Sequence, residues 1–481
     1  MSRAPQQRRG PQPQSQQKPK IQTGVAPRKL VLKLLLETRG FPTRRFAAAA
    51  DHTQLDPRDR ALARELLGGV LRRKRTLDAI ARPFCKRTRL EPAVRWTIRL
   101  ALYQRFYLEQ VPTYAAFGAT LDAGRYHLGR ALGFANAVLR AADRAATDEN
   151  PASAEPAADR LSVEDAAFGL RSWRFDEPIF PDPAAEPVSW HALAYSYPDL
   201  LVQRWIDAVG VEKAVRRMQL GNLAPTAAIR VNPARADRNR VVERLTEAGL
   251  RVVKPGQSED GCPIPINAYL LPDGMGDPRG LPGFADGGWS VQDLSSQQVL
   301  AFARPRAGER VLDLCAAPGG KSFAALETTG SKIELVACDV DAARLAAMEA
   351  DAKRLGHKVR TRLVSGARED LPGSRYDLLI LDLPCSNTGV LGRRAEARWR
   401  FDAESLQHAI DTQAGIADTA LSRLLVPGGR ALWSTCSLEP EEDLVGATAA
   451  AERAGLEVVD SHLFEPEPGR AGAFAAILRQ P

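Results

Sequence analysis

From about residue 310 onward, the sequence alternates between short, almost fully apolar runs and segments with helical periodicity. The runs ERVLDL and IELVACDVD are typical of strands that are buried on both faces. Each run is followed by a segment in which apolar residues recur three and four positions apart. Alternating β and α units predict a parallel sheet with helices on both faces. Because ligands of such sheets bind at the carboxyl ends of the strands, the residues just after each run are the candidate site residues.

The first strand leads into a glycine turn, LDLCAAPGGKS at residues 312–322. Gly319 and Gly320 would let the backbone approach a ligand closely. Asp339 ends the second strand, twenty residues after Gly319, and an acid at this spacing can accept both ribose hydroxyls of a nucleotide-like cofactor. A nicotinamide dinucleotide is disfavoured, because GxGxxG is absent and Pro318 occupies the loop. The alternative is a glycine turn that only packs a helix on a strand.

Two cysteines follow later strand-like runs, Cys385 in LILDLPCSNTG and Cys436 in ALWSTCSLEPEED. Each lies in a polar turn, which disfavours the alternative of a buried structural thiol. A thiolate is suited to add to carbon 6 of a pyrimidine ring and so make carbon 5 nucleophilic. Asp382 ends the strand before Cys385, and if protonated it could stabilise the charge displaced onto ring nitrogen 3.

Cysteine usage and apolar run length limit the class of protein. The chain has six cysteines in 481 residues and no CxxC pair, which argues against a zinc site or a disulfide scaffold. The early apolar run LVLKLLL is interrupted by Lys33 and is too short to span a membrane. The N-terminus is rich in Gln, Pro and Arg, so no signal peptide is expected. These features favour a cytoplasmic protein with reduced thiols, no metal and no membrane contact.

The formal charge is concentrated at the N-terminus. The net charge is +8, and residues 1–29 hold seven Arg and Lys and no acid, which leaves 8 − 7 = +1 for the rest. Residues 1–28 are also rich in Gln and Pro, so we expect a basic disordered tail. Such a tail could slide along phosphates or could only keep the chain soluble, and its composition leaves both open.

Changes in periodicity divide the remainder of the chain. Residues 29–145 carry helical periodicity throughout and predict a helical bundle. Residues 146–190 are interpreted as a linker or insertion outside the core, because their first part is acidic and rich in Ala, Pro and Ser. Residues 191–285 predict two helices and then a small unit of β-α-β-β order, in which LRVVKP and INAYLL are the later strands. Residues 286–481 hold the predicted α/β sheet.

The helical segment resembles the NusB-type RNA-binding domain. The similar stretches are DRALARELLGGVLRRKRTLD (59–78), RLALYQRFYLEQVPTYAAFGATLDAGR (99–125) and GFANAVLRAA (133–142). The resemblance implies a domain that binds RNA or docks on RNA-bound partners; a purely structural helical cap is the alternative. Helix starts are expected at Pro57 and Pro92. The basic run 72–75 could contact RNA or be an ordinary solvated face.

The β-α-β-β unit is similar to the RNA-recognition-like subdomain that precedes the catalytic domain of bacterial rRNA cytosine methyltransferases. Arg230 and Asn232 lie where that family has its Arg-Val-Asn element. Periodicity predicts only the strand and the helix. A role of this unit in RNA binding is what the resemblance implies.

The motifs of the α/β segment together resemble S-adenosylmethionine-dependent RNA 5-methylcytosine methyltransferases. The stretches that carry the resemblance are WSVQDLSS, LDLCAAPGGKS, LILDLPCSNTG and LLVPGGRALWSTCS. With the NusB-like segment ahead of them, the match is best to the bacterial RsmB (Sun/Fmu)-type rRNA cytosine-C5 methyltransferases, over residues 29–145 and 191–481. The resemblance implies an α/β Rossmann-like methyltransferase domain, preceded by an all-α NusB-like domain and a small α/β RNA-recognition-like subdomain.

The resemblance also implies roles for individual residues. It places S-adenosyl-L-methionine on the glycine loop and two strand-end acids: Cys315, Ala316, Ala317, Pro318, Gly319, Gly320, Lys321, Asp339 and Asp382. It implies that Cys436 is the nucleophile, that Cys385 assists its release, and that Asp382 also takes part in catalysis. Lys321 could contact the cofactor's carboxylate or cap the loop.

The sequence departs from the family pattern in three places. Ala367, after Gly366, stands where the family usually has an acid near the adenine amino group. Asn387 replaces the usual small residue of the PCSxTG motif. AGAF at 471–474 replaces the usual DGFF.

We therefore expect a monomeric enzyme that methylates carbon 5 of a cytosine in rRNA, with 16S rRNA as the expected substrate, through a covalent cysteine–cytosine adduct. The alternatives are the same reaction on tRNA or another rRNA position, and a non-catalytic RNA-binding ribosome assembly factor. A basic stretch after Cys385 is expected to face RNA, with a solvated helix face as the alternative: Arg393, Arg394, Arg398 and Arg400, together with Trp399.

Overall fold

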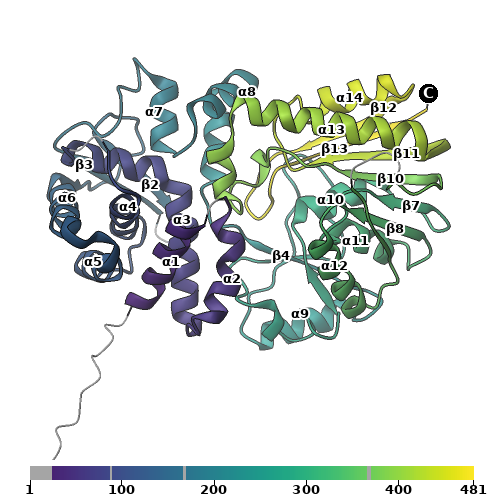
Figure 1. Ribbon diagram of the computed structural model, residues 1–481, viewed down its shortest axis with the longest axis horizontal. Helices are drawn as coiled ribbons and strands as arrows, with labels where there is room; N and C mark the ends of the chain where they lie inside the picture. The colour runs from purple at the N-terminus through teal and green to yellow at the C-terminus, as the bar shows by residue number, and fades with distance from the viewer. Residues whose placement is uncertain (1–23, 39, 87–88, 166–168, 366–369, 481) are drawn as a thin grey trace, which may run out of the picture.

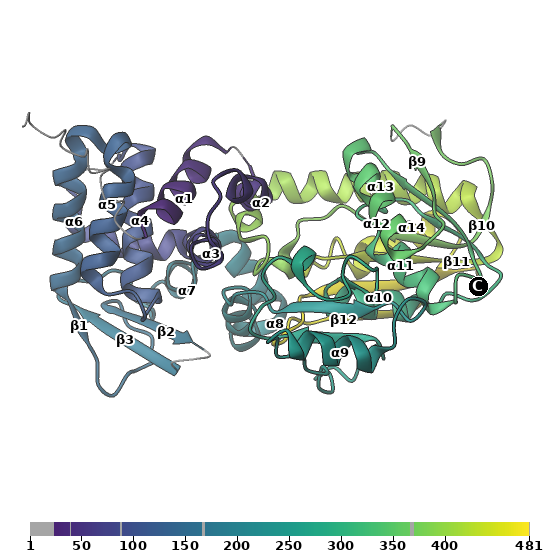
Figure 2. The same cartoon turned by 90° about the horizontal axis from the view of Figure 1, so that it is seen from below.

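The computed structural model describes residues 24–38, 40–86, 89–165, 169–365 and 370–480. A helical N-terminal half and a larger α/β half lie side by side (Figure 1). The helices of the N-terminal half are α1 (Val25–Glu37), α2 (Pro42–His52), α3 (Pro57–Ala81), α4 (Pro92–Tyr107), α5 (Thr113–Leu128) and α6 (Leu132–Ala145). α2 and α3 lie at the boundary with the α/β half (Figures 1 and 2).

The predicted helix starts at Pro57 and Pro92 are confirmed. Proline suits the first helical position, because the N–H that it lacks would have no partner inside the helix. The side chain of Asp56 caps α3 by accepting a hydrogen bond from the backbone N–H of Asp59 at 2.8 Å. The helices enclose an apolar core in which Leu67 and Phe106 are fully buried.

The predicted N-terminal tail is too long at its C-terminal end. Helix α1 begins at Val25, whereas the tail was expected to reach residue 28. Arg28 is buried, because its Nε donates to Oε1 of Gln104 at 2.9 Å and its aliphatic stem lies in the helical core. Residues 1–23, which hold most of the predicted tail, lie outside the described residues.

The prediction that residues 146–190 are a linker or insertion outside the core is wrong, because part of this segment packs on the helical core. They form an antiparallel sheet of order β1-β3-β2, from β1 (Ala146–Asp148), β2 (Arg160–Asp165) and β3 (Gly169–Phe175), followed by helix α7 (Pro187–Ala194). Alternate residues of β3 point into the helical core, where the rings of Trp173 and Phe175 lie 5.4 and 5.7 Å from that of Phe106. The acidic residues of this segment include ion-pair partners within the sheet, since Glu149 pairs with Arg160 at 2.8 Å.

The next segment begins with α8 (Asp199–Leu220), which starts directly after Pro198. A non-helical Gly210, with φ 78° and ψ 165°, divides it into the two predicted helices. An antiparallel sheet of order β5-β4-β6 follows, made of β4 (Ala227–Val231), β5 (Ala268–Leu271) and β6 (Trp289–Val291), with α9 (Arg238–Glu247) after β4. The predicted strand LRVVKP is wrong: it contributes only a bridge from Val253 to Leu270, because Pro255 cannot donate to a ladder.

Arg230 and Asn232 are buried in the protein. Their side chains therefore do not have the role in RNA binding that the resemblance implied for this element. Arg230 pairs with Glu327 at 2.7 Å and donates to the backbone carbonyl of Gly320 at 3.0 Å. Asn232 is fully buried and donates to the carbonyl of Leu355 at 3.0 Å. Both residues therefore fasten the β5-β4-β6 sheet to the α/β domain.

The α/β domain contains the predicted parallel strands, with an antiparallel pair added at one edge. In the described chain the sheet order is β12-β13-β11-β10-β7-β8-β9, and β13 runs antiparallel to its neighbours β11 and β12. The strands are β7 (Arg310–Asp313), β8 (Glu334–Asp339), β9 (Arg360–Leu363), β10 (Tyr376–Asp382), β11 (Leu425–Thr435), β12 (Glu457–Phe464) and β13 (Ala473–Arg479). The order reverses between β7 and β10, which is where sheets of this kind open a crevice for ligands.

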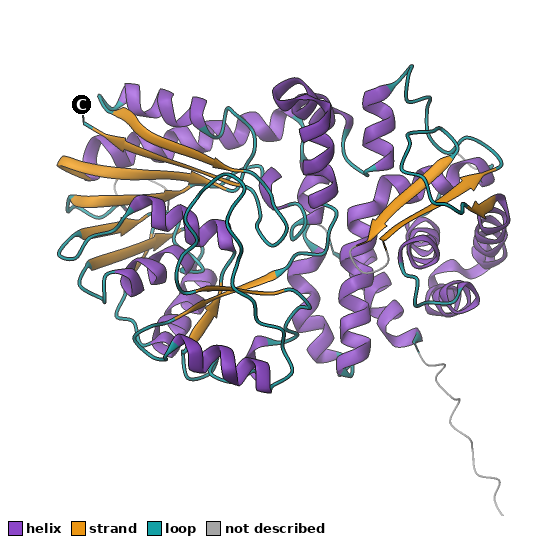
Figure 3. Ribbon diagram, turned by 180° about the vertical axis from the view of Figure 1, so that it is seen from behind, coloured by secondary structure: helices purple, strands orange, loops and turns teal. Residues whose placement is uncertain are grey.

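Helices cover both faces of this sheet, as the alternating pattern predicted (Figure 3). They are α10 (Leu294–Ala303), α11 (Gly320–Thr328), α12 (Ala342–Leu355), α13 (Ala403–Leu424) and α14 (Leu444–Arg453). Leu379 of β10 packs with α13 and α14, while its neighbour Ile380 packs on the other face with α10 and α11. Among the described residues, no helix is long and apolar enough to cross a membrane.

The basic stretch after Cys385 docks the α/β half on the helical half. Within it, Arg398 is fully buried, because its guanidinium donates to the carbonyls of Arg72 and Ser196, both at 3.1 Å, and of Gly221 at 2.8 Å. Burial lowers the pKa of this guanidinium to about 10. The prediction that Arg398 faces RNA is therefore wrong.

The basic run on α3 belongs to the same contact between the halves. Arg72 is buried, Lys74 lies over the ring of Trp399, and Arg75 pairs with Asp199 at 2.8 Å. The run is therefore not the solvated face that the sequence left open.

Candidate active site

The predicted site residues meet at one edge of the sheet. The loop that holds residues 315–321 follows β7, Asp339 ends β8, Asp382 ends β10, and Cys436 comes directly after β11. These strands are parallel neighbours in the sheet, so their carboxyl ends lie at the same edge. Cys385 joins the group because it lies three residues beyond the end of β10.

The glycine loop is held by its own backbone and by packing. The N–H of Ala316 donates to the carbonyl of Cys338 at 2.9 Å, and that of Gly319 donates to the carbonyl of Ala316 at 2.7 Å. Gly319 has φ +99°, and a Cβ there would lie 2.6 Å from the ring of Phe323. The glycine at 319 is thus required by the turn and by packing against α11, whatever a ligand requires. Cys315, in the same loop, is a neutral thiol, since burial raises its pKa.

Asp339 is nearly buried next to the glycine loop. Its Oδ2 accepts a hydrogen bond from the N–H of Ala317 at 3.0 Å, and its Oδ1 accepts one from the N–H of Asp341 at 3.1 Å. Arg344, which the sequence reading missed, lies 3.5 Å from Oδ2 and donates to the carbonyl of Ala317. Its position in the first turn of α12, just after the strand-end acid, is the signal that could have identified it.

Lys321 forms an ion pair with Asp382 at 2.6 Å. The other oxygen of Asp382 accepts a hydrogen bond from the hydroxyl of Ser434, the residue opposite it on β11, at 3.0 Å. The sequence left open whether Lys321 binds the cofactor or caps the loop. The structure shows that it links the glycine loop to the end of β10.

The two thiols are in contact, with 3.2 Å between Sγ of Cys385 and Sγ of Cys436. The hydrogen bond from Cys385 lowers the pKa of Cys436, and the positive charges of Arg394 and Lys321 act in the same direction. The same contact, together with burial, raises the pKa of Cys385 well above its usual range. Cys436 is therefore the thiol that ionises first.

Asn387 connects the thiols to a cation. It adopts the left-handed conformation, with φ 66°, and its amide donates to the carbonyl of Cys385 at 2.6 Å. Its Oδ1 lies 3.4 Å from Sγ of Cys436 and also accepts from Arg394. This departure from the family pattern thus places a polar side chain in contact with the candidate nucleophile.

Gly389 and Gly472 bring the altered C-terminal segment AGAF against the thiol loops. The N–H of Gly389 donates to the carbonyl of Cys436 at 3.0 Å, and the N–H of Gly472 donates to the carbonyl of Gly389 at 2.8 Å. A Cβ on Gly389 would lie 2.5 Å from the carbonyl oxygen of Gly472, so the packing requires glycine there.

A buried carboxylate, Glu442, joins the two thiol loops from beneath and was missed by the sequence reading. It accepts hydrogen bonds from the N–H of Ser386 at 2.8 Å, the hydroxyl of Ser437 at 2.5 Å and the amide of Gln413 at 3.0 Å. Burial raises its pKa. The run EPEED at 439–443, which begins three residues after Cys436, was the available signal, because acids so close to a reactive thiol are candidates for holding its loop.

Another buried acid, Asp313, ends β7 beneath the glycine loop. Its Oδ2 accepts from the hydroxyl of Ser322 at 2.7 Å, while Oδ1 has no partner among the described residues. Burial raises the pKa of Asp313 to about 7, with the charges of Asp382 and Asp339 adding to the shift. Below that pH the folded protein therefore holds a proton on this acid that the unfolded chain loses near its ordinary pKa of 3.8.

We expect Asp313 to make the protein less stable as pH rises from about 4 to about 7, because only the folded state must then bury or protonate this group. Asp313→Asn should remove that penalty. Thermal unfolding should be measured at pH 5, 6.5 and 8. The unfolding temperature of the variant should rise relative to that of the wild-type protein as pH rises. Asp377→Asn, at a half-exposed carboxylate on the same sheet, is the control. A difference between Asp313→Asn and wild type that does not change with pH would contradict the prediction.

The donor set suits a nucleoside cofactor. Asp339 and Asp382 lie beside the glycine loop, and each has a cation next to it, Arg344 and Lys321. An acid beside the loop can accept hydrogen bonds from ribose hydroxyls. Gly366 and Ala367, where the family pattern has its adenine-side acid, lie outside the described residues.

Comparisons with known proteins agree with these features. The family model described as 16S rRNA methyltransferase RsmB/F matches residues 300–474. Models of the NusB family and of the ferredoxin-like domain of RsmF/B-like methyltransferases match residues 26–144 and 197–264.

Relatives match over most of the chain. A ribosomal RNA small subunit methyltransferase B from Vibrio cholerae is 30% identical over 436 residues, covering 89% of this chain and 88% of the relative. A probable ribosomal RNA small subunit methyltransferase B from Bacillus subtilis is 29% identical, over 81% of this chain and 79% of the relative. The crystal structure of PH0851 has the same fold, with a TM-score of 0.72 at 20% identity over 95% of this chain and 99% of that chain. The chain therefore belongs to the RsmB/F family of 16S rRNA methyltransferases, which use S-adenosylmethionine and here carry an N-terminal NusB-like domain.

Proposed function

We propose that this enzyme methylates carbon 5 of a cytosine in 16S rRNA through a covalent bond between Cys436 and carbon 6 of the base. The observation that carries the proposal is the thiol pair at the sheet edge, with 3.2 Å between the two sulfur atoms. A pair in which one thiol has a lowered pKa and the other a raised pKa supports a division of labour between nucleophile and proton carrier.

Cys436 acts as the nucleophile in this proposal. Its thiolate forms a bond to carbon 6, and the electron pair of the carbon 5–carbon 6 double bond moves toward carbon 5 and ring nitrogen 3. The cations of Arg394 and Lys321 favour the thiolate before the base arrives. Cys385 stays protonated beside it and donates a hydrogen bond to the sulfur.

Asp382 is proposed to stabilise the charge that reaches ring nitrogen 3. In the free enzyme both of its oxygens accept, from Lys321 and from Ser434. Asp382 can therefore donate to the ring only after it gains a proton, which must arrive with or after the base. Lys321 would then lose its ion pair with Asp382 and would be free to contact the cofactor.

Bound S-adenosylmethionine supplies a methyl group on a positively charged sulfur for carbon 5. Asp339 and residues 315–321 would hold it, and Asp382 lies between this loop and the thiols. After the methyl group is added, a base must remove the proton from carbon 5 so that the bond between carbon 6 and Cys436 can break. Cys385, in contact with Cys436, is proposed to assist that release.

The target base must be unstacked to reach two partly buried thiols, which favours a cytosine in single-stranded or loop RNA. The alternatives are the same reaction at another rRNA position or on tRNA, and an assembly factor without catalysis. Bisulfite sequencing of rRNA and tRNA from cells that lack the gene separates them. Loss of one protected cytosine in 16S rRNA supports the proposal. Loss only in tRNA, or no loss at all, would refute it.

Cofactor affinity is expected to depend on Asp339. Asp339→Ala removes an acceptor for two ribose hydroxyls, and also the contact that holds the N–H of Ala317. We expect S-adenosylmethionine to bind about 5- to 150-fold more weakly, which corresponds to roughly 1–3 kcal/mol. Isothermal titration calorimetry measures this directly, with Asp341→Ala, at the cap of α12, as the control. Equal affinity of Asp339→Ala and wild type would place the ribose elsewhere.

A further inference from the structure

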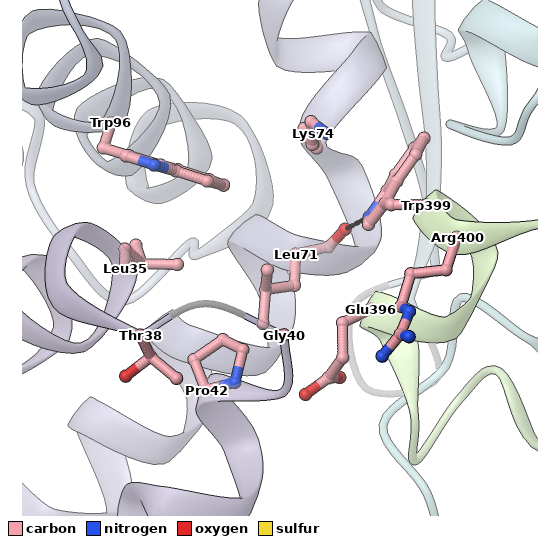
Figure 4. A pocket seen from close by; sticks show the side chains of 10 residues that line it. All are labelled: Leu35, Thr38, Gly40, Pro42, Leu71, Lys74, Trp96, Glu396, Trp399 and Arg400. Carbon is pink, nitrogen blue, oxygen red and sulfur yellow. Dashed lines mark hydrogen bonds between the residues drawn. The ribbon is translucent and has the colours of Figure 1, made fainter.

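A cavity of about 590 Å³ lies between the two halves of the protein, apart from the thiols. Its wall combines side chains from the helical half with the segment η6 (Ala395–Arg400) of the α/β half. Leu35, Pro42 and Leu71 make the wall largely apolar, and Trp96 and Trp399 flank it from opposite sides (Figure 4). The volume lies in the range of small-molecule sites.

Lys74 of α3 is one of the residues that line this cavity. Its Nζ lies 4.6 Å from the ring centroid of Trp399, and the described residues offer it no hydrogen bond or ion pair. Burial lowers the pKa of Lys74 to about 8, so the ammonium is poorly hydrated but still mostly charged at neutral pH. The cavity therefore presents a partly desolvated cation to whatever enters, and the exposed Arg400 adds a second cation at its rim.

Trp96 offers an aromatic face. The guanidinium of Arg99 lies over its ring at 4.4 Å, and the ring projects across the cavity above Leu35 (Figure 4). The carboxylate of Glu396 lies at the end of the cavity nearest Pro42, away from Lys74, and is tied to the N–H of Thr43 at 3.2 Å. Lys74 and the two tryptophans thus lie in one part of the cavity, whereas Glu396 and the guanidinium of Arg400 lie in the other (Figure 4).

We infer that this cavity binds one nucleotide of the substrate RNA, other than the nucleotide that is methylated. Its unstacked base lies against Trp96, and its phosphate pairs with Lys74. Every base has a face that can stack on an aromatic ring, and a phosphate is the anion that an RNA substrate brings. The inference rests on RNA as the substrate and not on the atom that is methylated.

The position of the cavity would allow a bound nucleotide to anchor the RNA to both halves of the protein. η6 follows the loop that carries Cys385, and Trp399 donates to the carbonyl of Leu71 on α3 at 2.9 Å. A nucleotide held there would contact both halves at once. The strand that leads to the thiols would therefore be anchored at a second point, which favours RNA that is single-stranded on both sides of the target.

Two variants of Trp96 separate stacking from bulk. Trp96→Leu keeps an apolar side chain without a π face, whereas Trp96→Phe keeps an aromatic ring. With full-length protein and fluorescein-labelled dodecacytidylate as the probe, anisotropy should show Trp96→Leu binding at least about fivefold more weakly and Trp96→Phe within about threefold of wild type. If the two variants bind equally, whether both are weakened or neither is, the base does not stack there and the inference is wrong.

Lys74→Met tests the phosphate contact, because it keeps the stem and removes the charge. The log–log salt dependence should fall by about 0.7, the value for one phosphate of a single strand, with Arg95→Met at an exposed neighbour of Trp96 as the control. The double variant Trp96→Leu/Lys74→Met should lose less than the sum of the single losses, since base and phosphate belong to one nucleotide. Additive losses would mean separate sites.

Cross-linking tests the same inference without any substitution. Ultraviolet irradiation of the wild-type complex, followed by nuclease digestion and mass spectrometry, should find a cytidine adduct on the peptide that contains Trp96 or on Trp399. Adducts confined to other peptides would overturn the assignment of this cavity.

Discussion

Cys436→Ala is expected to lower rRNA methylation by about three orders of magnitude or more, because it removes the proposed nucleophile for carbon 6 of the base. The variant should also form no covalent RNA complex. Transfer of a tritiated methyl group from S-adenosylmethionine to 16S rRNA measures the activity, and denaturing gel electrophoresis detects the complex. Cofactor affinity should change little, since Cys436 lies beyond Asp382 from the glycine loop.

Cys262→Ala is the matched control, because Cys262 is a partly exposed thiol outside the site. Thermal unfolding checks that each variant is folded. If Cys436→Ala methylates RNA at the same rate as the control, the thiols are structural and the proposed chemistry is wrong. A loss of activity that still leaves a covalent RNA complex would make Cys385 the nucleophile, against the direction in which the structure shifts the pKa of the two thiols.

The location of the site could be predicted because it depends on local patterns. Apolar runs mark buried strands; Asp339 and Asp382 end such runs, and Gly319 lies in the turn that follows another. Parallel strands bring those positions to one edge whatever the rest of the chain does. The same reasoning located both cysteines, although it could not show that their sulfur atoms touch.

The partners of charged residues could not be predicted, because charge in a sequence does not reveal burial. Arg398 resembles a surface cation in the run RRAEARWR, yet its acceptors are carbonyl groups of Arg72, Ser196 and Gly221, which lie far away in the chain. Arg230 likewise pairs with Glu327, 97 residues later. From the sequence alone such residues are interpreted as nucleic-acid contacts, because only the fold shows which groups of the protein they bind.

Residues 146–190 show a related limit. Six acids in their first part indicate a linker, and the only contrary signal in β2 is the alternation of Leu161 and Val163 with polar residues. A short strand whose buried apolar residues are Leu161 and Val163 gives a weak signal. The helical core that covers them decides their structure, and it is not visible in the segment itself.

Cys385→Ala is expected to fail in a different way from Cys436→Ala. The variant keeps the nucleophile, so addition to carbon 6 and methylation of carbon 5 should proceed, while release of Cys436 should slow. The enzyme should therefore accumulate as a covalent complex with methylated RNA that survives denaturing electrophoresis. The complex should disappear in the double variant, because the bond requires Cys436.

The contact between the thiols explains why the two losses should differ. Cys385 is in contact with Cys436 and holds a proton because its own pKa is raised, so it can donate a hydrogen bond to the sulfur that leaves carbon 6. Removing it also removes the main cause of the lowered pKa of Cys436, so addition should need a higher pH than in the wild-type enzyme. Cys385→Ser, with a hydroxyl in place of the thiol, should release RNA faster than Cys385→Ala. If neither variant accumulates the complex while both stay active, Cys385 has no part in release.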